Sequence, residues 1–108
     1  MINTAGELVA PPSVERALRS LDTVSDALVV GLPDKRWGQI VAALIVPSPE
    51  GRAQASSMSA DALSEALSEA LAPWEKVRLI VVVDELPTTA TGKPDPLAAA
   101  ELFSASER

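Results

Sequence analysis

Apolar residues recur at helical spacing in two segments of the chain. In PPSVERALRSLD, residues 11–22, they follow the i, i+3, i+4, i+7 pattern of one helix face: Val14, Ala17, Leu18 and Leu21. Pro12 suits the first turn of such a helix, where its missing N–H is not needed. SADALSEALSEALAP, residues 59–73, repeats the pattern and ends at Pro73. We predict one helix in each segment.

Three other runs are apolar without alternation. DALVVGL (26–32), QIVAALIVP (39–47) and VRLIVVVDELP (77–87) are short and rich in β-branched residues, which is typical of strands. Continuous apolar runs predict strands that are covered on both faces. GLPDKRWG, between the first two runs, has the Gly, Pro and Asp content of a turn, so these two runs should form a hairpin.

The remaining segments complete a small fold. PSPEGRAQASSMS (47–59) is polar and predicts a loop, whereas KPDPLAAAELFSASER (93–108) predicts a short helix that begins after Pro94 or Pro96. The predicted order is β-α-β-β-α-β-α. This is the α+β class, with about three main strands in one sheet and helices packed on it. A length of 108 residues fits a single domain.

Composition excludes several functions. A net charge of −6 argues against a general nucleic-acid binder, which needs a basic surface. The chain has no cysteine and no histidine, so it lacks a thiol nucleophile, the commonest general base and the commonest metal ligand. We expect no metal site on it. Apolar runs of about seven residues fall far short of the ~20 needed to span a bilayer, and MINTAGELV does not resemble a signal peptide. We expect a cytoplasmic protein.

Lys93 is the first candidate functional residue. It follows Gly92 in PTTATGKPDP, residues 87–96, an irregular Thr-rich segment. Gly92 permits backbone angles closed to other residues, and a lysine there can reach a phosphate or carboxylate as a point charge. The segment is not a P-loop, because Pro94 stands where Ser or Thr is required. An ordinary solvated lysine is the alternative.

Two further segments could bind a ligand. In DKRWGQ (34–39), Lys35 and Arg36 beside Trp37 could hold a phosphate or stack on a ring, or Trp37 could simply pack on the core. In TAGEL, Gly6 could allow close approach of a ligand to the backbone, or could be an ordinary turn glycine. The residues alone leave these alternatives open and form no self-contained catalytic set.

The order of these segments resembles one family from end to end. VVGLPDKRWGQIVAALIV, then a helix ending LAPWEKVRLIVVVDELPTTATGK, is similar to the C-terminal domain of the acyl-adenylating enzymes. These are the acyl-CoA synthetases, the adenylation domains of peptide synthetases and the luciferases. INTAGELVAPPSVE resembles the family segment that follows the hinge between the two domains. Gly6, Pro11 and Glu15 fall where the family segment has its glycine, proline and glutamate.

The resemblance implies a function for each candidate. The lysine at the position of Lys93 contacts the acyl carboxylate and the α-phosphate of ATP while acyl-AMP forms. The small domain then rotates, and the strand carrying Gly6 meets the pantetheine of CoA. ATP, Mg and the acyl group bind mainly to a large N-terminal AMP-binding domain that this chain lacks. We therefore expect residues 1–108 to be the separated C-terminal domain and to be inactive alone.

NTAGELV and GKPDPLAAA are similar to segments of the o-succinylbenzoate–CoA ligases of menaquinone synthesis, which favours that acid as substrate. Because the resemblance places the acyl-selecting pocket on the large domain, a fatty-acid or aryl ligase is the alternative. The chain departs from many acyl-CoA synthetases in having Lys93-Pro94-Asp95-Pro96 where they continue K-[IV]-x-R-R. Contacts to CoA would then come from Lys35 and Arg36. The competing interpretation is a free-standing small protein-interaction domain without catalysis.

Overall fold

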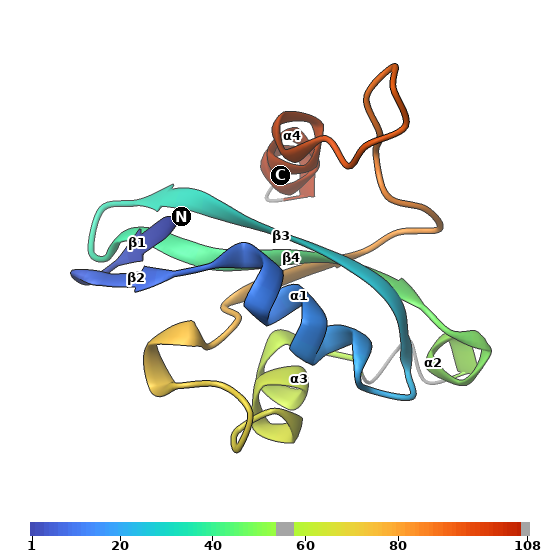
Figure 1. Ribbon diagram of the computed structural model, residues 1–108, viewed down its shortest axis with the longest axis horizontal. Helices are drawn as coiled ribbons and strands as arrows, with labels where there is room; N and C mark the ends of the chain where they lie inside the picture. The colour runs from blue at the N-terminus through green and yellow to red at the C-terminus, as the bar shows by residue number, and fades with distance from the viewer. Residues whose placement is uncertain (54–57, 107–108) are drawn as a thin grey trace.

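A five-stranded mixed sheet forms the centre of the chain in a computed structural model, which describes residues 1–53 and 58–106 (Figure 1). The strands are β1 (Ile2–Thr4), β2 (Glu7–Val9), β3 (Val24–Asp34), β4 (Gly38–Pro47) and β5 (Leu79–Val82). The helices are α1 (Pro11–Arg19), α2 (Pro49–Ala53), α3 (Ala60–Ala66) and α4 (Pro96–Ser106), with a 3-10 turn at Pro73–Glu75. The predicted α+β class is confirmed.

Strand β4 is the central strand of the sheet. Along one edge it forms the predicted antiparallel hairpin with β3, in continuous register from Asp26↔Val46 to Asp34↔Gly38. Along the other edge it pairs in parallel with β5 and meets β1 at Thr4↔Gly38. Because β4 has neighbours on both edges, its backbone groups are satisfied inside the sheet, as a buried strand requires.

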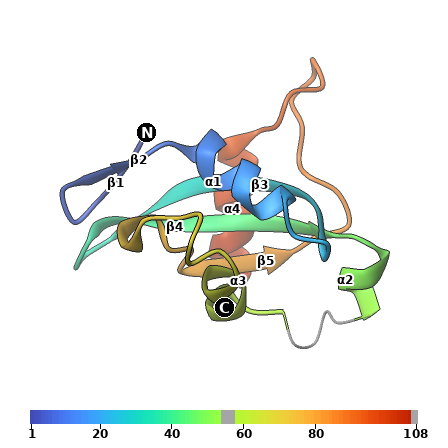
Figure 2. The same ribbon diagram turned by 60° about the horizontal axis from the view of Figure 1, so that its bottom comes forward.

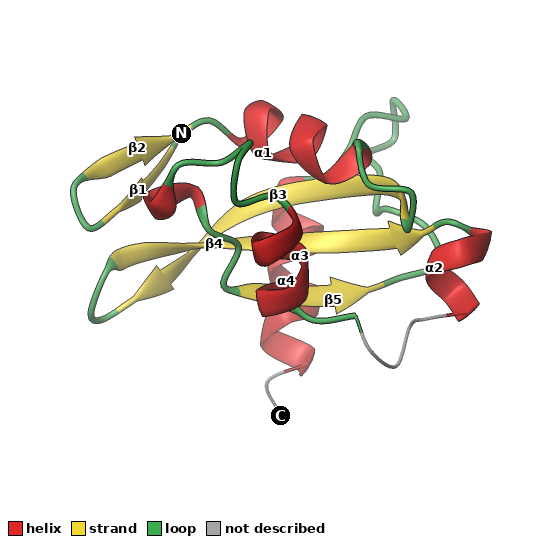
Figure 3. Cartoon of the chain, turned by 90° about the horizontal axis from the view of Figure 1, so that it is seen from below, coloured by secondary structure: helices red, strands yellow, loops and turns green. Residues whose placement is uncertain are grey.

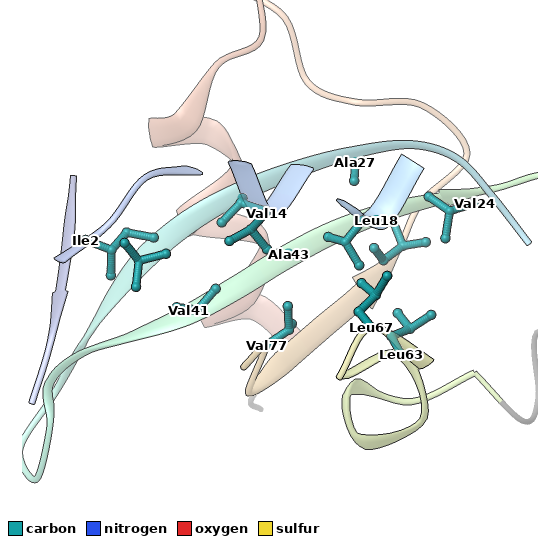
Figure 4. Packing of buried hydrophobic residues seen from close by; sticks show 13 residues of the cluster. Ile2, Val14, Leu18, Val24, Ala27, Val41, Ala43, Leu63, Leu67 and Val77 are labelled. Carbon is teal, nitrogen blue, oxygen red and sulfur yellow. The ribbon is translucent and has the colours of Figure 1, made fainter. Parts of the chain in front are cut away.

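Helices cover both faces of the sheet, as the apolar runs predicted. Helices α1 and α3 lie on one face and α4 on the other (Figures 1 and 3). Alternate residues of β4 point in opposite directions, so Val41, Ala43 and Ile45 join the cluster under α1 and α3. Ala42 and Leu44 join the cluster under α4. Figure 4 shows the first cluster, in which Val14 and Leu18 of α1 pack over β4.

The structure differs from the predicted elements in three places. The N-terminal strand of the predicted order, which carries Gly6, is a two-strand hairpin, β1–β2. The helix predicted over 59–73 ends at Ala66, and residues 67–71 continue as turns that still place Leu71 against the core. Part of the predicted loop 47–59 forms the short helix α2, where the Ser48 hydroxyl accepts a hydrogen bond from the Gly51 N–H (3.1 Å). Residues 54–57 of that loop lie outside the described residues.

Candidate functional site

Lys93 lies at the end of a tight hairpin between β5 and α4. The Thr89 N–H donates to the Lys93 carbonyl (2.7 Å), and the Gly92 N–H donates to the Thr89 carbonyl (2.9 Å). Gly92 has φ +86°, the left-handed conformation that completes a three-residue turn with a G1-type bulge. A bridge between Thr88 and Pro94 extends the pairing by one residue. The hairpin is therefore closed by its own backbone bonds.

The Lys93 side chain is exposed on this hairpin. Figures 1 and 2 show the segment projecting away from the sheet. Within the described residues, the ion pairs join other side chains: Arg19 with Glu15 and Asp26, Arg52 with Asp84, and Lys76 with Asp61. The Lys93 ammonium is consequently available to an anion that another molecule or domain brings to it.

Gly6 lies at the tip of the β1–β2 hairpin. Ala5 (φ +52°) and Gly6 (φ +86°) are both left-handed, which makes this a two-residue primed turn. A Cβ added at Gly6 would meet no atom within 4 Å, so the space beside the turn is open. The Ala5 N–H donates to the Trp37 carbonyl (2.7 Å), and this bond ties the Gly6 turn to the β3–β4 turn.

The position of Trp37 fits both interpretations of its segment, ligand binding and packing on the core. The side chain is half-buried, and the Asp34 carboxylate fixes the turn by accepting from the N–H groups of Arg36 (3.1 Å) and Trp37 (2.9 Å). The Arg78 guanidinium lies 4.7 Å from the centre of the indole ring, and that of Arg36 lies 5.8 Å away. Both distances are those of cation–π contacts.

Arg78 is a candidate that the sequence pattern did not indicate. It precedes β5 and looks like the polar boundary of a strand. The parallel pairing of β5 with β4 brings it to Trp37, since the Arg78 N–H donates to the Val41 carbonyl (2.8 Å). Lys35, Arg36 and Arg78 are all exposed, so this end of the sheet presents a basic surface around one aromatic ring.

The structure thus gathers Gly6, Lys35, Arg36 and Trp37 at one end of the sheet and places the Lys93 hairpin far from them. The views in Figures 1 and 2 agree on this separation. Two surface hollows, one beside α3 and one between α1 and α4, are lined by other residues. Lys93 is exposed and the space beside Gly6 is open, which fits a chain whose reaction site is completed by another surface.

No group of three or more Asp, Glu, His or Cys side chains in residues 1–53 and 58–106 could hold a metal ion. No helix in the same ranges is long and apolar enough to cross a bilayer. The candidate residues offer the exposed charges of Lys93 and the arginines and an open space beside the Gly6 backbone.

Comparison with known proteins gives consistent matches. The family described as AMP-binding enzyme C-terminal domain matches residues 13–93. The medium/long-chain-fatty-acid–CoA/3-oxocholest-4-en-26-oate–CoA ligase of Mycobacterium marinum is 40% identical over 87% of this chain and 16% of its own length. The 4-chlorobenzoate–CoA ligase of a Pseudomonas species is 41% identical over 86% of this chain and 17% of its own length.

A solved structure shows the same fold. The o-succinylbenzoate CoA synthetase of Bacillus subtilis, in complex with its acyl-adenylate intermediate, superposes with a TM-score of 0.76 at 31% identity. The match covers 91% of this chain and 19% of that protein. The chain spans about a sixth of the length of the curated relatives it matches.

Proposed function

Because this chain belongs to the AMP-binding enzyme C-terminal domain family, we propose that residues 1–108 serve as the C-terminal domain of an ATP-dependent acid–thiol ligase. A large N-terminal AMP-binding domain would be its partner. The observation that carries the proposal is Lys93, which is exposed on a self-closed hairpin and forms no ion pair within residues 1–53 and 58–106. Such a cation is suited to enter a site formed by another domain.

In the first step, an oxygen of the substrate carboxylate attacks the α-phosphorus of ATP. The bond from that phosphorus to the pyrophosphate oxygen breaks, which yields acyl-AMP and pyrophosphate. Negative charge is spread over the oxygens of the transferring phosphoryl group, and the Lys93 ammonium stabilises it. No proton transfer is needed, so a chain without histidine can take part. We propose that Mg-ATP binds mainly to the large domain.

In the second step, the sulfur of a thiol attacks the acyl carbonyl carbon and loses its proton, and AMP leaves with the electrons of the broken C–O bond. We propose that the Gly6 end of the sheet faces this thiol. The absence of a side chain at Gly6 leaves room for a narrow chain such as pantetheine. Lys35, Arg36 and Arg78 around Trp37 supply cations for the phosphates of CoA, the expected thiol.

The identity of the acid is a separate question. The Bacillus subtilis o-succinylbenzoate synthetase is one of the similar structures, at 31% identity, and this acid is one candidate. Relatives at 40% and 41% identity carry the names of other acids, so similarity in this domain does not discriminate among them. We propose that the large domain selects the acid. Assaying the full-length ligase with o-succinylbenzoate, a long-chain fatty acid and 4-chlorobenzoate tests the narrower prediction, and no turnover of o-succinylbenzoate would refute it.

The decisive experiment separates the two steps in the full-length ligase. Lys93→Ala should lower ATP–pyrophosphate exchange about 10²–10³-fold, because a charge contact made in the transition state is lost. Thioester formation from supplied acyl-AMP should stay near the wild-type rate. Lys76→Ala, which removes another exposed lysine, is the matched control and should exchange normally.

Two results would contradict the proposal. The first is a Lys93→Ala ligase that forms acyl-AMP at nearly the wild-type rate. In that case, Lys93 is an ordinary solvated lysine. The second is ATP–pyrophosphate exchange by the 108-residue chain alone, which we expect to be inactive without the large domain.

A further inference from the structure

The hairpin that carries Lys93 has two distinct faces. Cross-strand partners in a hairpin point to the same side, and successive residues point to opposite sides. Thr89 and Lys93 are partners through the bond that closes the turn, whereas Thr88 is bridged to Pro94. The side chains of Thr89 and Lys93 therefore share one face, and that of Thr88 lies on the other.

A hydroxyl pair lies on the lysine face. The Thr89 Oγ1 and Thr91 Oγ1 atoms are 3.0 Å apart, so one hydroxyl donates to the other. Each hydroxyl carries a single proton, and only one of the two protons is used within the pair. The second remains free to donate outward. Both residues are exposed, as is Lys93.

We propose that the Thr89–Thr91 hydroxyl pair is a second hydrogen-bond donor to the anion that Lys93 contacts, namely the phosphate oxygens of ATP during adenylation. This rests on the function proposed above. A lysine has a long flexible stem and contributes a point charge. The hydroxyl pair is held close to the backbone of a closed turn, so it can donate a hydrogen bond in a fixed direction. Together they offer a phosphate group two kinds of donor from one face.

The hairpin backbone provides the required rigidity. The N–H groups of Thr89 and Gly92 are both bonded within the turn, and a further bond from the Asp95 N–H to the Pro87 carbonyl (2.9 Å) closes its base. None of these bonds uses a side-chain hydroxyl. Removing the Thr89 hydroxyl should therefore leave the loop conformation intact, which makes the proposal testable by substitution.

The test measures both half-reactions of the full-length ligase. Thr89→Val keeps the side-chain shape but removes the hydroxyl, and should lower kcat/KM for ATP in pyrophosphate exchange about tenfold. Thioester formation from supplied acyl-AMP should not change. Thr89→Ser should recover most of the rate. Thr88→Val makes the same change on the opposite face and should behave as wild type.

Loop structure is checked separately by amide hydrogen exchange at Thr89 and Gly92 in the 108-residue chain. The proposal expects equal protection in wild type and Thr89→Val. Faster exchange in the variant would mean that Thr89 acts only through loop stability, which overturns the proposal. Equal adenylation rates for Thr89→Val and Thr88→Val also overturn it. If Lys93→Ala remains inactive in that case, the proposed function stands while the role of the hydroxyls falls.

Discussion

At the scale of single residues, Ala5 is the most unusual position in the chain. Among the described residues it is the non-glycine residue with positive φ. In a primed turn the first central position favours Asn, Asp or Gly, because a Cβ is strained there. The bond from its N–H to the Trp37 carbonyl holds it in place. The turn that presents Gly6 therefore carries local strain.

This strain predicts opposite effects at neighbouring positions. Ala5→Asn should raise the free energy of unfolding by about 0.5–1 kcal/mol, because Asn tolerates the left-handed conformation. Gly6→Ala should lower it by about 1 kcal/mol through backbone strain alone, since no atom lies within 4 Å of the added Cβ. Urea denaturation of the 108-residue chain measures both. A change of the same sign in the two variants would show that φ does not control this turn.

Residue identity predicted some candidates and could not predict others. Lys93 and Gly92 were identifiable because Gly-Lys in a turn-rich segment suggests a special backbone and a free charge. Whether Trp37 packs inward or binds outward could not be decided, because its partner Arg78 is far away in sequence. Their contact depends on the register between β4 and β5, which no local pattern encodes.

At the scale of elements, most outward-facing N–H groups along the free edge of β3 are occupied or missing. The Val29 N–H points away from β4 and donates to the Glu15 carboxylate of α1 (2.9 Å). The orientation repeats every second residue, so Ala27, Gly31 and Pro33 share it. The Ala27 N–H donates to the Asp26 carboxylate (2.8 Å), and Pro33 has no N–H. The free edge of β3 therefore offers few backbone N–H donors to another strand.

Glu15 should therefore stabilise the sheet and limit association. Its side chain is only 14% exposed, and its carboxylate also pairs with Arg19 (3.7 Å). Glu15→Ala should lower the free energy of unfolding by about 1–2 kcal/mol and leave the Val29 N–H without its partner. Light scattering at rising concentration should then reveal more association than in wild type.

Glu65→Ala, at an exposed position of α3, is the matched control and should change neither stability nor association. If Glu15→Ala behaves like Glu65→Ala, the hydrogen bond to β3 contributes nothing measurable and the edge is protected by other means.

Elements with strong apolar patterns were predictable, whereas short polar ones were not. β3, β4 and α1 follow directly from their apolar residues, because burial dominates their energy. α2 has five residues and depends on the Ser48 cap and on a close fit at Gly51, where an added Cβ would lie 2.0 Å from the Thr23 carbonyl oxygen. α3 ends early because Leu67 leaves the helical conformation, although the apolar spacing continues to Leu71.

At the scale of the whole molecule, β4 joins two separate clusters into one cooperative unit. Leu44 is fully buried under α4 and Ile45 under α1 and α3. Leu44→Ala and Ile45→Ala should each lower the free energy of unfolding by about 2–5 kcal/mol, since each leaves a cavity. Both variants should still unfold in one transition. Tryptophan fluorescence and far-ultraviolet circular dichroism should give the same midpoint for each variant, and separate midpoints would mean that the two faces unfold independently.

The distance between the Lys93 hairpin and the Gly6 turn has a consequence for the proposed ligase. The Gly6 turn joins two strands of the sheet, whereas the Lys93 hairpin projects away from the sheet, so in the proposed ligase the two would not reach one reaction centre at the same time (Figure 1). The two proposed steps would then follow one another, with the domain withdrawing one end before it presents the other. The chain needs no moving part of its own for this. The hinge between the two domains would then set the rate of this exchange. A stiffer hinge should slow the exchange of ends and leave the rate of each chemical step unchanged.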